Sequence, residues 1–160
     1  MGVLDPLEVL PAARHVGLGD LPWVPNPAYP GTWMRLMQAD LDAGISVLGG
    51  RLPPGLEVGT HRHAGAVHMF TLSGAWGYRE HDYVNQAGSY LYEPPGSVHT
   101  LYVPADNDEL TDTLTVIYGQ TEYLDAGGEI VAITNAASNL AAYLEACEAA
   151  GVPRPTGIIR

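Results

Sequence analysis

The sequence predicts a mainly β protein, a barrel or sandwich of short strands followed by one C-terminal α-helix. Glycine and proline are abundant, with 19 and 13 of the 160 residues, and 46% of the chain is hydrophobic. This composition suits a folded protein with many turns. Between residues 33 and 133, short segments of alternating or β-branched character are separated by turn residues, which is typical of barrels and sandwiches. The length favours one domain over residues 1–160.

Residues 1–32 predict an N-terminal arm. Six prolines fall in this stretch, and proline both interrupts helices and removes a backbone donor from a strand ladder. We expect an extended arm with one short helix, lying over a sheet edge or a neighbouring subunit. Together with the edges of an open sheet, such an arm predicts a homodimer or homotetramer.

Eight strands are predicted for the barrel at residues 33–133. They lie at residues 33–38, 45–52, 67–72, 76–83, 90–93, 98–103, 113–118 and 130–133. Turn residues such as Pro53-Pro54-Gly55 and Pro94-Pro95-Gly96 separate them. At the start of the fourth strand, the small residues Ala75 and Gly77 share one face, and small side chains leave room. We therefore expect this face, and not the face of Trp76, to line the interior cavity.

Residues 134–160 predict a single amphipathic helix and a tail. Four side chains recur there at helical spacing, Leu140, Tyr143, Leu144 and Cys147. Asn135 or Ser138 can cap the start of the helix, and Gly151 followed by Pro153 ends it.

Charge and cysteine content exclude several functions. The chain has 7 basic and 18 acidic residues and a net charge of -11, which repels phosphate backbones and anionic lipid, so we expect no nucleic-acid and no membrane partner. Every basic residue is arginine, so chemistry that needs a lysine, such as a Schiff base or a P-loop, is excluded. The single cysteine forms no intrachain disulfide, and no signal sequence or membrane-spanning run is seen, so we expect a cytoplasmic protein.

Histidines form the strongest motif. His61 and His63 are two residues apart, and residues at that spacing in a strand project from one face, so both imidazoles can face one metal ion. The frame around them is specific. It runs through Gly55, His61-Arg62-His63, His68 and Gly74, and continues through Gly88, Pro94-Pro95-Gly96 and His99.

This frame resembles the two cupin motifs over residues 55–99. The resemblance implies a cupin double-stranded β-helix, a jelly-roll barrel, with His61, His63 and His99 as metal ligands. The pattern departs in two places, because His68 stands where the cupin family usually has Glu and Val103 where it commonly has Asn. The sequence from His61 to Gly74 and from Tyr92 to Leu101 is similar to that of the 2,4'-dihydroxyacetophenone dioxygenases, and more loosely to that of the acetylacetone-cleaving dioxygenases.

The dioxygenase resemblance implies Fe(II) as cofactor, with a small-molecule ketone and O2 as partners. The implied reaction cleaves a carbon–carbon bond beside a carbonyl in an aryl hydroxyketone or related dicarbonyl compound and spares the ring, as in aromatic compound catabolism. Zinc or another divalent metal is the alternative ion. The alternative function is a metal-binding cupin without oxygen chemistry, such as an isomerase, a hydrolase or a zinc-holding sensory module, because the fold alone does not separate these.

Three further residues are candidates for catalysis. His68 is a metal ligand, a hydrogen-bonding contact to substrate oxygen, or an ordinary core histidine, and we favour the contact over ligation. Glu93 is expected to accept a proton from the far nitrogen of a ligand imidazole, with Arg79 keeping the carboxylate ionised. A plain barrel salt bridge between Glu93 and Arg79 is the alternative.

Overall fold

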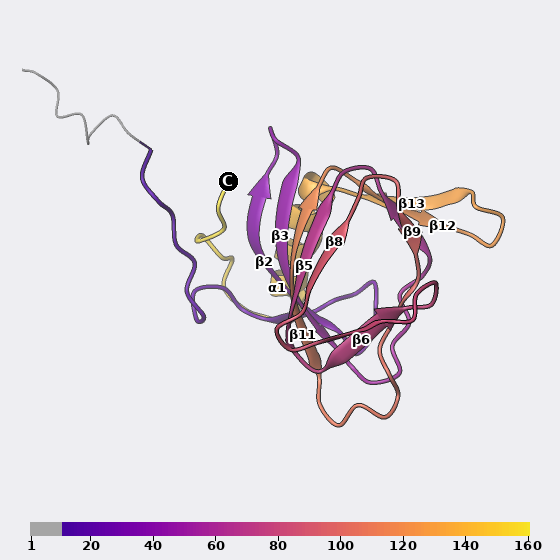
Figure 1. Cartoon of the computed structure of the whole chain (residues 1–160). Coiled ribbons are helices and arrows are strands. Elements are labelled where there is room, and N and C mark those ends of the chain that lie inside the picture. Colours follow the sequence, from indigo (N-terminus) through magenta and orange to yellow (C-terminus); the bar gives the residue numbers. More distant parts are fainter. Residues whose placement is uncertain (1–10) are drawn as a thin grey trace, which may run out of the picture.

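The computed structural model describes residues 11–160, which form short β-strands and one helix (Figure 1). The elements in chain order are β1 (Val24–Pro25), β2 (Trp33–Asp40), β3 (Ile45–Leu52), β4 (His61–His63), β5 (Val67–Ser73), β6 (Ala75–Tyr78), β7 (Val84–Gln86), β8 (Tyr90–Glu93), β9 (Val98–His99), β10 (Leu101–Tyr102), β11 (Thr111–Tyr118), β12 (Thr121–Leu124), β13 (Ile130–Thr134) and α1 (Ala136–Ala149). The fold is mainly β with one C-terminal helix, as predicted.

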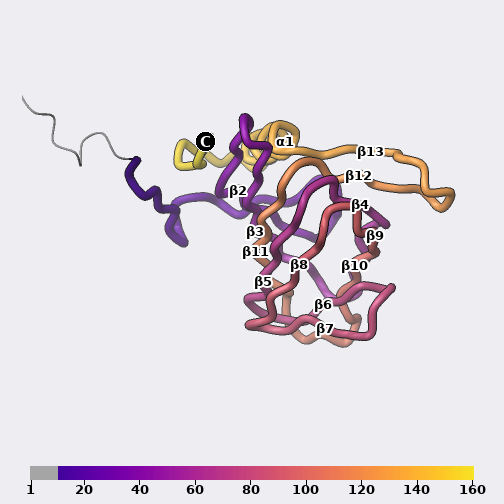
Figure 2. The backbone as a smooth tube through the Cα atoms, turned by 45° about the horizontal axis from the view of Figure 1, so that its top comes forward, coloured from indigo at the N-terminus to yellow at the C-terminus, as the bar shows by residue number. Residues whose placement is uncertain are grey.

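The strands form three antiparallel groups that enclose an interior. The largest has the order β1-β2-β3-β11-β5-β8, and two smaller groups have the orders β13-β12-β4-β9 and β10-β6-β7. Figures 1 and 2 show the groups curving around a common centre, with the β12–β13 hairpin extending outward. Some neighbouring strands are far apart in sequence, as in a jelly roll: β11 pairs with both β3 and β5.

Two apolar clusters stabilise this arrangement. In one, Leu140 and Tyr143 of α1 pack against Val24 and Leu36 of the first two strands, and the Tyr143 hydroxyl donates a hydrogen bond to the Pro22 carbonyl at 2.6 Å. The other lies inside the barrel and contains Met69, Trp76, Tyr78, Leu91, Leu101 and Val103. The helix therefore closes the sheet at β1 and β2, while the second cluster supports the barrel interior.

The predicted helix is confirmed. Asn135 is the N-cap and accepts a hydrogen bond from the Ser138 backbone, while the Ser138 hydroxyl accepts one from the Asn135 backbone. Both capping candidates are thus used, in one capping box. Gly151, at φ +67°, follows the end of the helix, and a left-handed glycine is a common way to terminate one. No helix in the described part of the chain has the length and apolar character needed to cross a membrane.

The N-terminal arm is confirmed where the structure describes it. Its strand β1 pairs with the edge strand β2, Val24 opposite Met34, so the arm covers a sheet edge. The expected short helix is not found at residues 11–32. Residues 1–10 lie outside the described residues.

The prediction for the strand at 76–83 is wrong in its length and in the face that points into the barrel. The strand β6 ends at Tyr78, and its inner face carries the large residues of the buried cluster: Trp76 is 0% exposed and Tyr78 is 2% exposed. The opposite face has no free space, because a Cβ on Gly77 would lie 3.0 Å from the Tyr102 ring. Gly77 is small because an aromatic ring packs on it.

Four strands lie outside the eight predicted ranges, namely β1, β4, β7 and β12, although the argument for the H-x-H pair assumes a strand at β4. The strand β12 pairs with β4, with Thr121 opposite His63 and Tyr123 opposite His61. It therefore supports the strand that carries the H-x-H pair.

Candidate metal centre

Three buried histidines converge inside the barrel. His61 and His63 project from the same face of β4, and His99 lies on the neighbouring strand β9, opposite His61. They are 7%, 5% and 2% exposed, and one ring nitrogen from each lies within 4.8 Å of the other two. Arg62, between the first two, faces the other way and forms an ion pair with Glu122. The structure thus brings together the three residues that the sequence predicts as ligands.

Hydrogen bonds fix the rings of the H-x-H pair. His61 Nδ1 lies 2.8 Å from the Gly59 carbonyl, and His63 Nδ1 lies 3.0 Å from the Thr121 hydroxyl. The Nε2 atom of each ring is left for a ligand, which is the usual arrangement at metal-binding histidines. Burial lowers the pKa of His61, and lowers the pKa of His63 to about 4. Both imidazoles are therefore neutral at neutral pH, the form that binds metal.

Glu93 lies beside the same nitrogens. Its Oε2 is 3.1 Å from His99 Nε2 and 3.3 Å from His63 Nε2, while Oε1 accepts a hydrogen bond from the Tyr78 hydroxyl. Burial alone raises the pKa of Glu93, but contacts with His99 and Tyr78 outweigh it and lower that pKa. The sequence predicts that Glu93 contacts the nitrogen of a ligand imidazole that points away from the metal. At His63 that nitrogen, Nδ1, contacts Thr121 instead, and the carboxylate lies beside Nε2.

This arrangement fits a divalent cation. Among the described residues, Glu93 Oε2 and His99 Nε2 are buried without a hydrogen-bond partner of acceptable geometry, although they lie close to each other. Buried polar atoms in this state are costly unless something satisfies them. A metal ion bound by His61, His63 and His99 would satisfy the nitrogen and balance the carboxylate charge, and imidazole suits iron and zinc alike.

The predicted contact between Arg79 and Glu93 is wrong. Arg79 forms an ion pair with Glu57 at 2.8 Å, and both side chains are more than half exposed. Its guanidinium lies over the Tyr102 ring, 4.2 Å from the ring centroid. Tyr78, the residue before Arg79, points inward and contacts Glu93 instead, and its ring stacks on His99 with centroids 4.1 Å apart.

His68 lies on the outer face of β5, away from the centre. Along this strand Val67 and Met69 are buried and line the cavity, while His68 and Phe70 alternate with them and point outward. His68 Nδ1 is 2.7 Å from the Tyr90 hydroxyl, and the rings stack. The geometry therefore leaves His68 without access to a metal at the three-histidine site.

We expect His68→Ala to keep its full metal content and to change substrate turnover by no more than about twofold, because substitutions outside a site are usually worth less than 0.5 kcal/mol. Iron stoichiometry and initial rates of the purified variant check this. Loss of iron from His68→Ala would show that His68 moves inward and that the outward placement is not the functional one.

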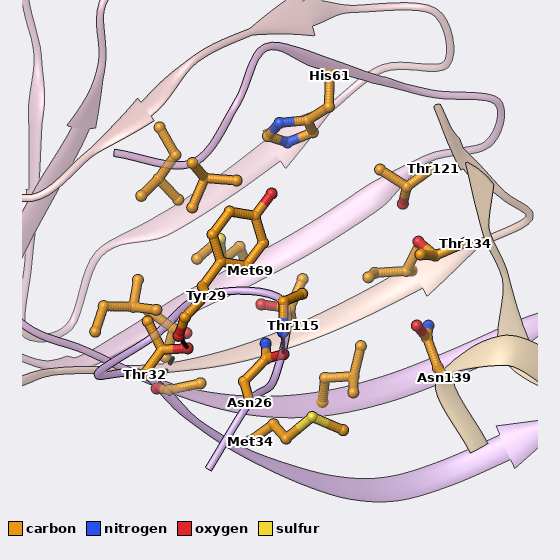
Figure 3. A pocket seen from close by; sticks show the side chains of 18 of the residues that line it. Asn26, Tyr29, Thr32, Met34, His61, Met69, Thr115, Thr121, Thr134 and Asn139 are labelled. Atoms are coloured by element: carbon orange, nitrogen blue, oxygen red, sulfur yellow. Dashed lines mark hydrogen bonds between the residues drawn. The ribbon is translucent and has the colours of Figure 1, made fainter. Parts of the chain in front are cut away.

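The cavity next to the histidines measures ≈ 380 Å³. His61, His63, Tyr78 and Glu93 line its metal end. Several other lining residues were not predicted, because they come from the arm, from β12 and from α1: Asn26, Tyr29, Thr121, Tyr123 and Asn139. Figure 3 shows Tyr29 crossing the cavity with its hydroxyl toward His61. Burial raises the pKa of Tyr29, so its hydroxyl stays neutral.

The fold and these residues define a cupin with a three-histidine site that could hold a metal. The chain belongs to the ChrR cupin-like domain family, which matches residues 11–122. No sequence among the curated proteins matches significantly.

Three solved structures are similar to most of the chain. An RmlC-like cupin protein from Ralstonia eutropha JMP134 is 29% identical, with a TM-score of 0.86, over 98% of this chain and 99% of that chain. A cupin-like protein of unknown function from the same organism is 29% identical, with a TM-score of 0.81, over 86% of each chain. An acetylacetone dioxygenase from Acinetobacter johnsonii is 19% identical, with a TM-score of 0.74, over 91% of this chain and 99% of that chain, which shows a shared fold.

Proposed function

We propose that the protein is a non-haem Fe(II)-dependent dioxygenase that cleaves a carbon–carbon bond beside a carbonyl in an aryl hydroxyketone or related dicarbonyl compound. The observation that carries the proposal is the set of three buried imidazoles, two of which, His61 and His63, line a largely apolar cavity. The likeness in fold to an acetylacetone dioxygenase supports it. The sequences of the two histidine motifs resemble those of the 2,4'-dihydroxyacetophenone dioxygenases more than those of the acetylacetone-cleaving dioxygenases.

The charge of the site supports a chelating, anionic substrate. Three neutral imidazoles add no negative charge, so a divalent ion keeps a net positive charge even beside the single Glu93 carboxylate. An enolised hydroxyketone or diketone brings two oxygens and a negative charge. Bound Fe(II) would supply Lewis acidity and redox chemistry, while the electrons that reduce O2 overall come from the cleaved substrate.

The chain's own residues would prepare the substrate. Glu93 is a buried, ionised carboxylate beside the three histidines and can take the proton that the ketone loses on enolisation. Tyr78 holds that carboxylate through its hydroxyl, and keeps the His99 ring in place by stacking. Met69 and Val67 line the apolar wall and exclude water from the reacting carbons.

The test is metal content combined with oxygen uptake. We expect anaerobically purified protein to bind about one iron per chain, and to consume oxygen only when an aryl hydroxyketone or a diketone is added. Product analysis should show two fragments, each with one atom of O2 at the carbon of the cleaved bond, and an intact ring where the substrate has one. Zinc as the native metal, with no oxygen uptake after iron loading, would overturn the proposal and favour the isomerase, hydrolase or sensory-module alternative.

A further inference from the structure

Five large apolar side chains are exposed together on the outward face of the largest sheet. They are Phe70 and Leu72 of β5, Tyr90 and Tyr92 of β8, and Tyr118 at the end of β11, and each is between 41% and 59% exposed. Strand β5 pairs with β11 on one side and with β8 on the other (Figure 1), so the five form one surface, here called the aromatic face. The chemistry proposed above uses none of them.

The side chains of the aromatic face contact one another around His68. The centroid of the His68 ring lies 5.4 Å from that of Tyr92 and 6.0 Å from that of Tyr118. The rings of Phe70 and Tyr90 lie 5.2 Å apart, and the hydrogen bond between His68 and Tyr90 joins the two strands at 2.7 Å. These contacts order the face in advance, which lowers the entropy that a partner would lose on binding it.

The rest of the described chain leaves the aromatic face open. The N-terminal arm crosses the outward side of this sheet at β3, where a Cβ on Gly49 would lie 2.8 Å from the Trp23 indole. The guanidinium groups of Arg35 and Arg51 lie over that indole and hold it there. The arm therefore covers the sheet at β2 and β3 but not at β11, β5 and β8.

The size of the aromatic face matches the apolar part of a stable dimer interface. A large side chain has roughly 200 Å² of surface, so the five side chains, about half exposed, present roughly 500 Å². A stable interface buries about 800 Å² on each partner, of which about 60% is apolar. The apolar part is thus also about 500 Å², and patches of this size commonly mark interaction sites.

Charge indicates which partner covers the face. The outward residues of β5 and β8, and those of β11 from 114 to 118, include no acid, lysine or arginine. Because the chain has a net charge of -11, two copies repel each other wherever acidic surfaces meet and approach closely only through an uncharged surface. A basic partner would bind the acidic surfaces instead. The aromatic face therefore fits a second copy, since a two-fold axis brings the same uncharged patch together from both chains.

We propose that two copies of this chain form a homodimer through the aromatic face, related by a two-fold axis. Packing the rings of one copy against those of its partner buries the apolar surface that a monomer leaves in water. This interface uses neither the N-terminal arm nor a sheet edge. It is independent of the proposed function, because Val67 and Met69 line the cavity on the opposite side of β5.

The experiment measures the mass of the full chain in solution. By light scattering after gel filtration, we expect the wild type at micromolar concentration to have the mass of two chains. Phe70→Glu places one charge per copy in the middle of the face, where both charges would lose their water on association. Its dimer dissociation constant, measured by sedimentation equilibrium, should rise by more than about 100-fold, and the variant should then have the mass of one chain.

Val131→Glu is the matched control, because it adds the same charge at a residue of β13 that is 65% exposed and lies outside the aromatic face. It should keep the wild-type mass. Leu72→Glu, at a side chain 59% exposed, should also dissociate the dimer, and it replaces Phe70→Glu if circular dichroism shows that variant to be unfolded. A monomeric wild type would show that another molecule covers the face and would overturn the inference. Dimers that survive a folded Phe70→Glu or Leu72→Glu, or that Val131→Glu dissociates, would overturn it equally.

Discussion

His99→Ala should leave the protein without tightly bound metal. His99 is the one ligand on β9, and the two imidazoles that remain on β4 cannot reproduce a three-ligand chelate. Because even the hydrogen-bonding partners of metal ligands contribute about 10–100-fold to affinity, we expect the loss of a ligand to weaken metal binding by more than about 100-fold. Iron stoichiometry after anaerobic loading and gel filtration measures this.

Two further variants make the result specific. His99→Gln keeps most of the side-chain volume against Tyr78, so it separates loss of a ligand from loss of packing, and circular dichroism shows whether it stays folded. His15→Ala removes an exposed imidazole from the arm and should bind iron like the wild type. Full iron occupancy in folded His99→Ala would mean that another residue completes the site.

Local features of the fold could be predicted from the sequence. The helix α1 has its cap, its apolar spacing and its glycine within one stretch, and all three agree with the structure. The strand β12 was not predicted because its pairing is remote: Thr121 contacts His63 from 58 residues away. The residues of β12 also have no sequence feature that distinguishes a strand from a loop.

The candidate site, too, could be predicted from the sequence only in part. His61 and His63 follow from the two-residue period of a strand, which holds wherever a strand forms. The prediction that His68 contacts the substrate was wrong because both faces of β5 are apolar. Met69 lies inside and Phe70 is 41% exposed outside, so hydrophobicity does not distinguish the inner face from the outer face. Tyr29 and Asn139 line the cavity because of where the arm and the helix pack. The spacing of the motifs does not predict that packing.

Gly65→Ala should destabilise the protein by more than about 3 kcal/mol, because the added methyl group cannot fit. Gly65 joins β4 to β5, and a Cβ built there would lie 2.7 Å from the Tyr118 carbonyl carbon and closer still to its oxygen. Relief requires β4 to move away from β11, which displaces His61 and His63 together. At roughly 2–4 °C per kcal/mol, thermal unfolding should show a fall of at least about 6 °C, with weaker iron binding.

Gly59→Ala is the control for this prediction, since it places the same methyl group two residues before His61 instead of two residues after His63. Nothing lies within 4 Å of a Cβ at Gly59, and the carbonyl that contacts His61 Nδ1 is kept. We therefore expect its unfolding free energy to stay within about 0.5 kcal/mol of the wild type and its iron content to be normal. Equal melting temperatures for the two variants would show that the β4–β5 turn tolerates a side chain, and that close backbone packing against Tyr118 does not hold the H-x-H strand in place.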